Sequence, residues 1–455
     1  MAALFSDGSI EARTRRATLF SVGARVFNAG LLFLTHVMLA RLMGAAEFGL
    51  FSLATTWVLA LLGLATLGLT MTPQRFVPDY AVRGEASLVA GLYRFAHLAP
   101  FLAGLLIAIG GVALLHLFLP HLPAETRLVI GLALFALPAL AVIDVVEGFA
   151  LAHEWNDLAY GVTFILRPLL LPVLLLGAWL GGSPAVALPA VIAFVGSAWI
   201  AAVCLVVLIR PRMRALYPAA RPRQEPRQEP RHEPRHEPRR WFALALPALF
   251  ADGAFLTMAY ADVLLLSAFA SASEVGVYVA ATKIVGVVAF VHFGLSYACA
   301  HNFARLHAHG ERTALIAYAG KAANWTFWPS LAAASLLVLA APVLMGLFGK
   351  DFGGGAVLVP ILLVALVARA FIGPSEQLLM MTDRQGAVTV IYGLAALLNL
   401  ALVLFLAPLF GAVGVACGAM AASAAATTAT AVCVRRSFGC FIHAGSAPQG
   451  TGAGA

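Results

Sequence analysis

Charged residues are scarce in this sequence of 455 residues. Asp, Glu, Lys and Arg make up only 11% of the chain, whereas 62% of its residues are hydrophobic and the mean hydropathy is +0.92. Soluble globular domains carry about 25% charged residues, so this composition lies far outside their range. The chain is therefore predicted to be an integral membrane protein, and a soluble enzyme is excluded.

Cysteine is also rare, and none of the five cysteines forms a pair at the spacing of metal ligands. The sequence contains no Walker loop, zinc motif or nucleophile elbow either. We therefore expect no disulfide framework, no metal site, no cofactor and no catalytic residue, and the chain is not predicted to be an enzyme. The cysteines are Cys204, Cys299, Cys417, Cys433 and Cys440.

Long apolar runs dominate what the sequence does contain. A membrane-spanning helix needs about 20 apolar residues, and twelve runs reach that length, six before a polar segment and six after it. This pattern predicts an all-α membrane protein with about twelve transmembrane helices. The runs are 17–43, 48–72, 89–118, 128–152, 158–180, 185–209, 241–269, 275–301, 325–348, 356–381, 387–406 and 410–434.

The 29 Lys and Arg residues predict how the chain crosses the membrane, because positively charged loops stay on the cytoplasmic side. With the N-terminus inside, 21 of them are cytoplasmic, three lie on the opposite side and five lie within spans. Both termini are therefore predicted to be cytoplasmic. The predicted segments are a cytoplasmic tail (1–16), a six-helix bundle (17–209), a cytoplasmic linker (210–240), a second six-helix bundle (241–434) and a cytoplasmic tail (435–455).

The two halves resemble each other in sequence. The segment EFGLFSLAT at 47–55 aligns with EVGVYVAAT at 274–282, at a shift of 227 residues. Because each half has an even number of spans, the halves enter the membrane in the same direction and form parallel repeats. This architecture is typical of transporters that rock one bundle against the other.

The linker contains four tandem Arg-x-Glu-Pro units between Arg223 and Pro238. Proline at every fourth residue forbids a regular helix and favours an extended chain. The segment is either a docking site for anionic lipid headgroups or a partner, or a solvated linker whose charge fixes the topology. The low complexity of the repeat favours the second interpretation.

Basic residues within the spans are candidate ligands for an anionic substrate, since a buried charge costs about 2.5 to 3.5 kcal/mol and needs a partner or a function. Arg25 shares a polar stripe with Asn28 on the first span, and a snorkelling arginine is the alternative interpretation. Arg167 precedes Pro168, which should bend the fifth span. Lys283 and Arg369 complete this set.

Acidic residues also lie within the predicted spans. They are either proton or cation sites that couple to transport, or static counter-ions to the buried bases. Arg369 and Glu376 are separated by about 10 Å of helical rise, too far for direct contact unless Pro374 kinks the chain. The acidic residues are Asp144, Glu147, Asp252, Asp262 and Glu376.

Several segments of the chain resemble one membrane-protein family. The segments are ARLMGAAEFGLFSLA (40–54), SASEVGVYVAATKIV (271–285), LFGKDFGGGAVLVPILLVAL and LAPLFGAVGVACGAM. They are similar to the Wzx-type polysaccharide flippases of the multidrug, oligosaccharidyl-lipid and polysaccharide exporter (MOP) superfamily. The resemblance covers nearly the whole chain outside 210–240.

This resemblance implies a flippase in the bacterial inner membrane that moves an undecaprenyl-pyrophosphate-linked oligosaccharide from the cytoplasmic to the periplasmic leaflet, for O-antigen or exopolysaccharide synthesis. It implies a cationic central cavity with alternating access. Arg25 matches the position of the cavity arginine that this family carries on its first span. Membrane lipids, a polysaccharide polymerase and glycosyltransferases are the expected partners, and nucleic acid is not. The alternatives are a cation-coupled multidrug exporter and a membrane scaffold of a glycan-assembly complex.

Overall fold

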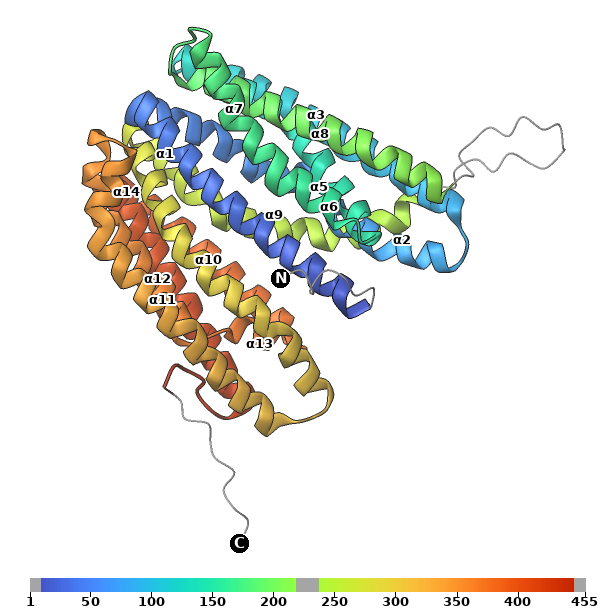
Figure 1. Cartoon of the computed structure of the whole chain (residues 1–455). Coiled ribbons are helices and arrows are strands. Elements are labelled where there is room, and N and C mark those ends of the chain that lie inside the picture. The colour runs from blue at the N-terminus through green and yellow to red at the C-terminus, as the bar shows by residue number, and fades with distance from the viewer. Residues whose placement is uncertain (1–9, 218–236, 446–455) are drawn as a thin grey trace, which may run out of the picture. The chain divides into compact units, whose positions relative to one another are not determined.

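A computed structural model describes residues 10–217 and 237–445 of the chain, and the regular elements in these ranges are helices (Figure 1). Nine of these helices are long and apolar enough to cross a membrane. The described chain divides into two compact units, each treated separately below. Unit 1 comprises Met1–Leu42 and Leu53–Leu256, and unit 2 comprises Met43–Ser52 and Thr257–Ala455.

Unit 1 is built around helix α5, whose residues are almost all buried. Its sequence, LPALAVIDVVEGFALA, is apolar except for Asp144 and Glu147, as expected for a helix surrounded by other helices. Helices α2, α3 and α8 pack against it. The elements of this part of the chain are α1 (Ile10–Ala65), η2 (Leu69–Met71), α2 (Thr72–Val82), α3 (Ala86–Phe118), α4 (Ala124–Leu134), α5 (Leu137–Ala152), α6 (Asn156–Tyr160), η3 (Gly161–Leu166), α7 (Arg167–Leu180) and α8 (Ala187–Leu216).

Unit 2 is a second helical bundle, in which α10 packs on α11 and α12, and α12 packs on α14 (Figure 1). Helix α9 begins in unit 1 and ends in unit 2. The elements are α9 (Pro238–Phe269), α10 (Ala272–Ala308), α11 (Arg312–Phe348), η5 (Lys350–Val357), α12 (Leu358–Phe371), α13 (Ser375–Met381) and α14 (Gln385–Phe438).

The helices are compatible with the twelve predicted spans, with one difference in how the spans are divided. Helix α1 contains the first two spans and α14 the last two, each interrupted at a glycine with positive φ, Gly44 (77°) and Gly411 (53°). Glycine adopts this backbone conformation without the steric cost that other residues meet. The predicted span 356–381 is broken instead, because α12 ends at Phe371 and α13 begins at Ser375.

Several helices also extend beyond the apolar runs that predicted them. Helix α8 continues to Leu216 although its apolar run ends at 209, and α11 begins at Arg312 rather than at 325. Hydropathy detects only the part of a helix that lies in hydrocarbon, whereas backbone hydrogen bonding continues into the polar ends. Of the predicted linker, residues 218–236 lie outside the described part of the chain.

The two copies of the sequence repeat meet in space through their glycines. A Cβ atom on Gly49 of α1 would lie 1.7 Å from the Ala272 carbonyl oxygen, and one on Gly276 of α10 would lie 2.3 Å from the Ala45 carbonyl oxygen. Only hydrogen at both positions allows the backbones to approach this closely. Glycine at these two repeat positions is therefore required by the crossing of α1 and α10 within unit 2.

Candidate functional site

The first candidate site is a cation on α1 held against aromatic rings. The Arg25 side chain is exposed, and its guanidinium carbon lies 5.7 Å from the centroid of the Tyr160 ring and 5.4 Å from that of Phe164. Cation–π contact orients the guanidinium without neutralising its charge. Within the described residues no carboxylate lies within ion-pair distance of Arg25. The guanidinium therefore keeps its positive charge on an exposed side chain.

The other polar residues of the α1 stripe behave differently. The Thr35 hydroxyl donates to the Leu31 carbonyl at 2.8 Å, and a ring nitrogen of His36 lies 2.6 Å from the Leu32 carbonyl oxygen. Both side chains are thus engaged by their own helix. Asn28 is partly exposed one turn beyond Arg25, on the same face of α1.

Glu147 lies close to this aromatic–cation site. It accepts a hydrogen bond of 2.7 Å from the Thr163 hydroxyl, and the charged groups near it are Asp144 and Arg25. Thr163 and the two rings beneath Arg25 belong to one stretch of chain, formed by α6 and η3. That stretch thus contacts both the cation and the carboxyl group.

A π-helical segment precedes Arg167, and the bend at Pro168 stays a prediction. Residues Gly161–Leu166 form this wider turn, and α7 starts at Arg167 with Pro168 in its first turn. A π-helical turn inside a membrane helix is often associated with a functional site. Arg167 is half-buried at this junction, and Asp144 is also half-buried, on α5.

In unit 2, Arg369 and Glu376 form an ion pair. The Nη2–Oε2 distance is 2.5 Å, and the side chains retain 21% and 18% of their exposure. The break at Gly373 (φ 63°) and Pro374 ends α12 and brings the two residues together, as the predicted kink requires. Tyr392 donates a second hydrogen bond to Glu376. Glu376 thus neutralises the charge of Arg369 in this arrangement.

Asp262 on α9 is the acidic residue held by neutral groups. Tyr278 donates to one carboxylate oxygen at 3.2 Å and Asn399 donates to the other at 2.7 Å. Among the described residues Asp262 has no basic partner, and the buried Oδ1 atom of Asn399 has no hydrogen bond. Two oxygens of different residues are therefore available to a proton or cation.

The remaining predicted site residues are less informative. Lys283 on α10 is half-buried, and no described carboxylate pairs with it. Asp252 lies on α9, but its side chain lies outside the described residues. No cluster of metal-ligating side chains occurs among the residues the structure describes.

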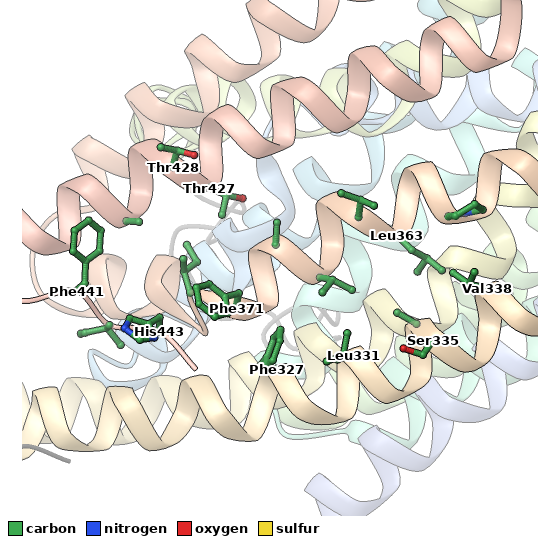
Figure 2. Close-up of a pocket in the computed structure, with 18 of the residues that line it drawn as sticks. Phe327, Leu331, Ser335, Val338, Leu363, Phe371, Thr427, Thr428, Phe441 and His443 are labelled. Carbon is green, nitrogen blue, oxygen red and sulfur yellow. The ribbon is translucent and has the colours of Figure 1, made fainter. Parts of the chain in front are cut away.

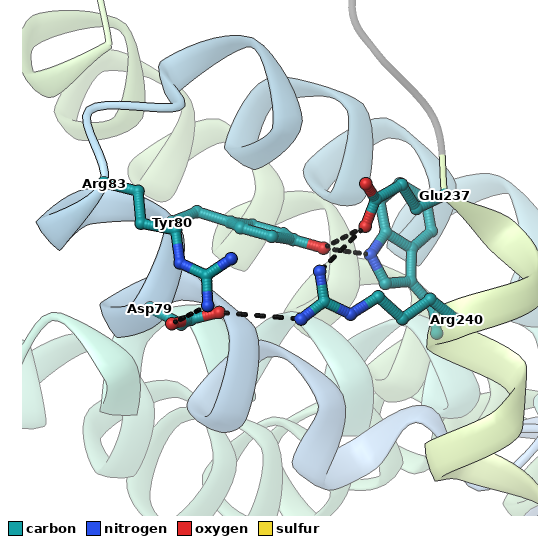
Figure 3. Close-up of polar contacts among 6 residues, drawn as sticks. Asp79, Tyr80, Arg83, Glu237 and Arg240 are labelled. Atoms are coloured by element: carbon teal, nitrogen blue, oxygen red, sulfur yellow. Dashed lines mark hydrogen bonds and ion pairs between the residues drawn. The ribbon is translucent and has the colours of Figure 1, made fainter.

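A network of polar contacts joins the end of the linker to unit 1 (Figure 3). Glu237, the acid of the fourth Arg-x-Glu-Pro unit, accepts hydrogen bonds from the Tyr80 hydroxyl at 3.1 Å and from Arg240 at 3.2 Å. The indole nitrogen of the fully buried Trp241 donates to the same hydroxyl at 2.9 Å. Burial raises the pKa of Tyr80 above its usual value of 10, so this hydroxyl remains protonated at neutral pH.

Sequence reasoning missed the partners of these charges. Tyr160 and Phe164 are four residues apart, a spacing that places them on one helix face, and this could have predicted the ring pair beneath Arg25. No comparable signal links Asp262 to Asn399, which lies 137 residues away within an apolar run. The docking of Glu237 was also missed, because its unit does not differ in sequence from the one before it.

Comparison with solved structures shows what this helical arrangement is similar to. An inward-facing multidrug resistance MATE family transporter of the MOP superfamily has a TM-score of 0.71 at 14% identity, covering 90% of this chain and 94% of its own. The lipid II flippase MurJ in an inward closed conformation has a TM-score of 0.69 at 13% identity, covering 92% of this chain and 87% of its own.

A third similar structure is a MOP superfamily transporter from Pyrococcus furiosus, described as having a binding pocket of reverse polarity. Its TM-score is 0.60 at 14% identity, with 94% of this chain and 95% of its own covered. At these identities the likeness shows the fold alone, which is that of MOP superfamily transporters and flippases. No curated protein matches the sequence significantly.

The family follows from the sequence itself. A family model described as "polysaccharide biosynthesis protein" matches residues 15–298, which is more than half of the chain. The matched region contains Arg25, its aromatic partners and the linker. The chain is a multi-pass membrane protein that belongs to the polysaccharide biosynthesis protein family, with the fold of MOP superfamily transporters.

Proposed function

We propose that this protein flips an undecaprenyl-pyrophosphate-linked oligosaccharide from the cytoplasmic to the periplasmic leaflet of a bacterial inner membrane. It does so by alternating access, with both termini cytoplasmic, and supplies O-antigen or exopolysaccharide synthesis. Membership of the polysaccharide biosynthesis family and the fold shared with a lipid II flippase support this proposal. A polysaccharide polymerase and glycosyltransferases are its proposed partners.

The single observation that carries the proposal is the state of Arg25. Its side chain is exposed on α1, its guanidinium lies over two aromatic rings, and no carboxylate in the described chain pairs with it. A guanidinium binds phosphate through forked, charge-assisted hydrogen bonds. A lipid-linked sugar carries its negative charge on the pyrophosphate, which is the group that Arg25 would hold.

The other predicted ligands take secondary roles in this proposal. Asn28 adjoins Arg25 and offers an amide donor to the same phosphate. Arg167 and Lys283 are half-buried cations on other helices, which would lower the cost of moving an anion through the bilayer. Arg369 already neutralises Glu376, so we assign it to the stability of unit 2.

We further propose that Asp262 couples flipping to a cation gradient. Its carboxylate has only neutral hydrogen-bond donors among the described residues, and the Asn399 Oδ1 atom beside it is an unused acceptor. A proton or a small cation would satisfy both oxygens. Asp144, Glu147 and Asp252 remain weaker candidates for coupling, and Glu376 is weakened by its ion pair.

A second candidate function is a cation-coupled multidrug exporter. The Asp262 site would suit cation coupling, and a multidrug resistance MATE family transporter shares the fold. The two functions are distinguished with purified protein in proteoliposomes. Transfer of a fluorescent undecaprenyl-pyrophosphate oligosaccharide across the bilayer, without gradient-driven export of organic cations, supports the flippase. Export of organic cations without lipid transfer supports the exporter instead.

A membrane scaffold is the remaining alternative, and the Arg-x-Glu-Pro segment is its candidate docking site. Deleting residues 223–234 retains Glu237 and its contacts with unit 1, so the deletion tests the repeats alone. The flippase proposal predicts normal lipid transfer by the deleted protein. Loss of complex assembly in a protein that itself transfers no lipid would support the scaffold.

A further inference from the structure

Unit 2 contains an apolar groove that the proposed function does not use (Figure 2). Its volume is about 950 Å³, and its walls are formed by α11, α12 and the second half of α14. Leu331 and Val338 line one wall, and Val364 and Phe371 line another. A groove this apolar on a helix bundle in a membrane is suited to a hydrocarbon chain.

The segment that follows α14 closes one end of the groove. The Ala444 amide donates to the Phe371 carbonyl at 2.8 Å, and the Gly445 amide donates to Asn324 at 3.0 Å. The His443 ring stacks on Phe371 with centroids 5.4 Å apart and an interplanar angle of 15°. Figure 2 shows Phe441 and His443 together at this end, opposite Val338. The end wall is therefore held in place by specific contacts.

The length of the groove matches the depth of one membrane leaflet. Its lining on α11 runs from Phe327 to Leu339, which corresponds to about 18 Å at the rise of an α-helix. One leaflet contributes about 15 Å of hydrocarbon. A chain that fills the groove would thus extend from the polar surface to about the middle of the bilayer.

The closed end of the groove carries positive charge. The guanidinium carbon of Arg435 lies 4.9 Å from the centroid of Phe441, a lining residue, and the Arg435 side chain is exposed. Arg436 is its exposed neighbour in the last turn of α14. A hydrocarbon-lined groove with an arginine at one end is complementary to a lipid with an anionic headgroup.

We propose that this groove binds an acyl chain of an anionic phospholipid from the cytoplasmic leaflet, with the lipid phosphate on Arg435. The leaflet follows from the proposed cytoplasmic C-terminus. The occupant is a phospholipid rather than the undecaprenyl tail of a substrate, because the groove accommodates only one leaflet's depth of chain and a polyprenyl tail is much longer. The site is thus one for a bound membrane lipid, separate in chemistry from the Arg25 site.

The test uses the full-length protein in nanodiscs of zwitterionic lipid that contain phosphatidylglycerol with a photoreactive diazirine at its chain end. Crosslinked peptides are mapped by mass spectrometry. We expect labelling on α11 and α12 near Val338 and Val364. Replacing phosphatidylglycerol with the same probe on phosphatidylcholine should reduce the labelling about fivefold, the ratio that one basic residue near an anionic lipid provides.

Two pairs of variants separate the groove from general contact with lipid. Val364→Trp fills the groove, and Leu394→Trp places the same ring at a similarly exposed position, 62% against 56%, outside it. Only the first should abolish the labelling. Arg435→Gln should remove the preference for phosphatidylglycerol, and Arg436→Gln should retain it. The melting temperatures of each pair should agree, so that misfolding is not the cause.

Three results would overturn the proposal. Undiminished labelling in Val364→Trp would show that the probe contacts only the general lipid surface. Equal labelling by both headgroups in the wild type would remove the role of Arg435. Displacement of the probe by polyprenyl diphosphate, but not by unlabelled phosphatidylglycerol, would assign the groove to the substrate tail.

Discussion

The close contact between Gly49 and Gly276 makes a strong prediction about stability. Replacing Gly49 with Ala introduces a Cβ atom 1.7 Å from the Ala272 carbonyl oxygen and 2.7 Å from its carbonyl carbon. Ordinary van der Waals contact needs about twice the shorter distance. The obstructing atoms belong to a helix backbone and cannot rotate away, so α1 and α10 must separate or bend.

The magnitude follows from two opposing contributions. Overpacking a close contact costs about 1–3 kcal/mol, and more when backbone must move. Alanine returns about 1 kcal/mol of helix propensity relative to glycine. Because the clash is with backbone, we expect Gly49→Ala to lower the free energy of unfolding by about 2 kcal/mol. Gly276→Ala should have a similar effect, since its Cβ atom would lie 2.3 Å from the Ala45 carbonyl oxygen.

The assay is reversible unfolding in mixed detergent micelles, followed by circular dichroism. Gly286→Ala provides the matched control on α10, because no atom lies within 4 Å of the position of its Cβ atom. This control should be as stable as the wild type or more stable by up to about 1 kcal/mol. If Gly49→Ala proves as stable as Gly286→Ala, the argument that the repeat glycines are required by a helix crossing is wrong.

Three further predictions concern individual side chains. Glu376→Gln removes the ion pair of the partly buried Arg369 and should cost about 1–3 kcal/mol in the same unfolding assay. Tyr80→Phe removes the hydroxyl that bonds to Glu237 and to the Trp241 indole, and should cost a similar amount. Because the Tyr80 pKa is raised, the wild-type contribution persists below pH 10 and is lost as the pH rises through the folded-state value. Burial lowers the pKa of His153. The contribution of His153 to stability is therefore complete above about pH 6.5 and is lost as the pH falls through the lowered pKa. NMR titration of the imidazole ring would measure this pKa.

The sequence could predict the helical architecture because a membrane imposes one strong rule. Apolar runs of about 20 residues must form helices, and the twelve runs are compatible with the helices observed. Hydropathy separated the runs near 44 and 411, where α1 and α14 are interrupted, but it could not reveal that α12 and α13 are separate. Those outcomes depend on the conformations of Gly44, Gly411 and Gly373.

The sequence identified the charged residues of the candidate sites but not all of their partners. A charge in an apolar run is conspicuous, so Arg25, Asp262 and Glu376 could be selected from the sequence. The contact of Glu376 with Arg369 could be anticipated from Pro374, whereas the partners of Asp262 could not, because they depend on packing between distant segments. Asn399 and Tyr392 are not conspicuous in the sequence, yet Asn399 donates a hydrogen bond to Asp262 and Tyr392 donates one to Glu376.

The most direct test of the flippase proposal measures the initial rate at which a fluorescent undecaprenyl-pyrophosphate oligosaccharide crosses the bilayer of proteoliposomes. The proteins compared are the wild type, Arg25→Ala, Arg25→Lys and Arg41→Ala, the last removing another exposed arginine of α1. Loss of a charged hydrogen-bond donor is worth about 1.5–3 kcal/mol, or roughly 10- to 100-fold in rate. We expect that loss in Arg25→Ala, partial activity in Arg25→Lys and a normal rate in Arg41→Ala. A wild-type rate in well-folded Arg25→Ala would contradict the account.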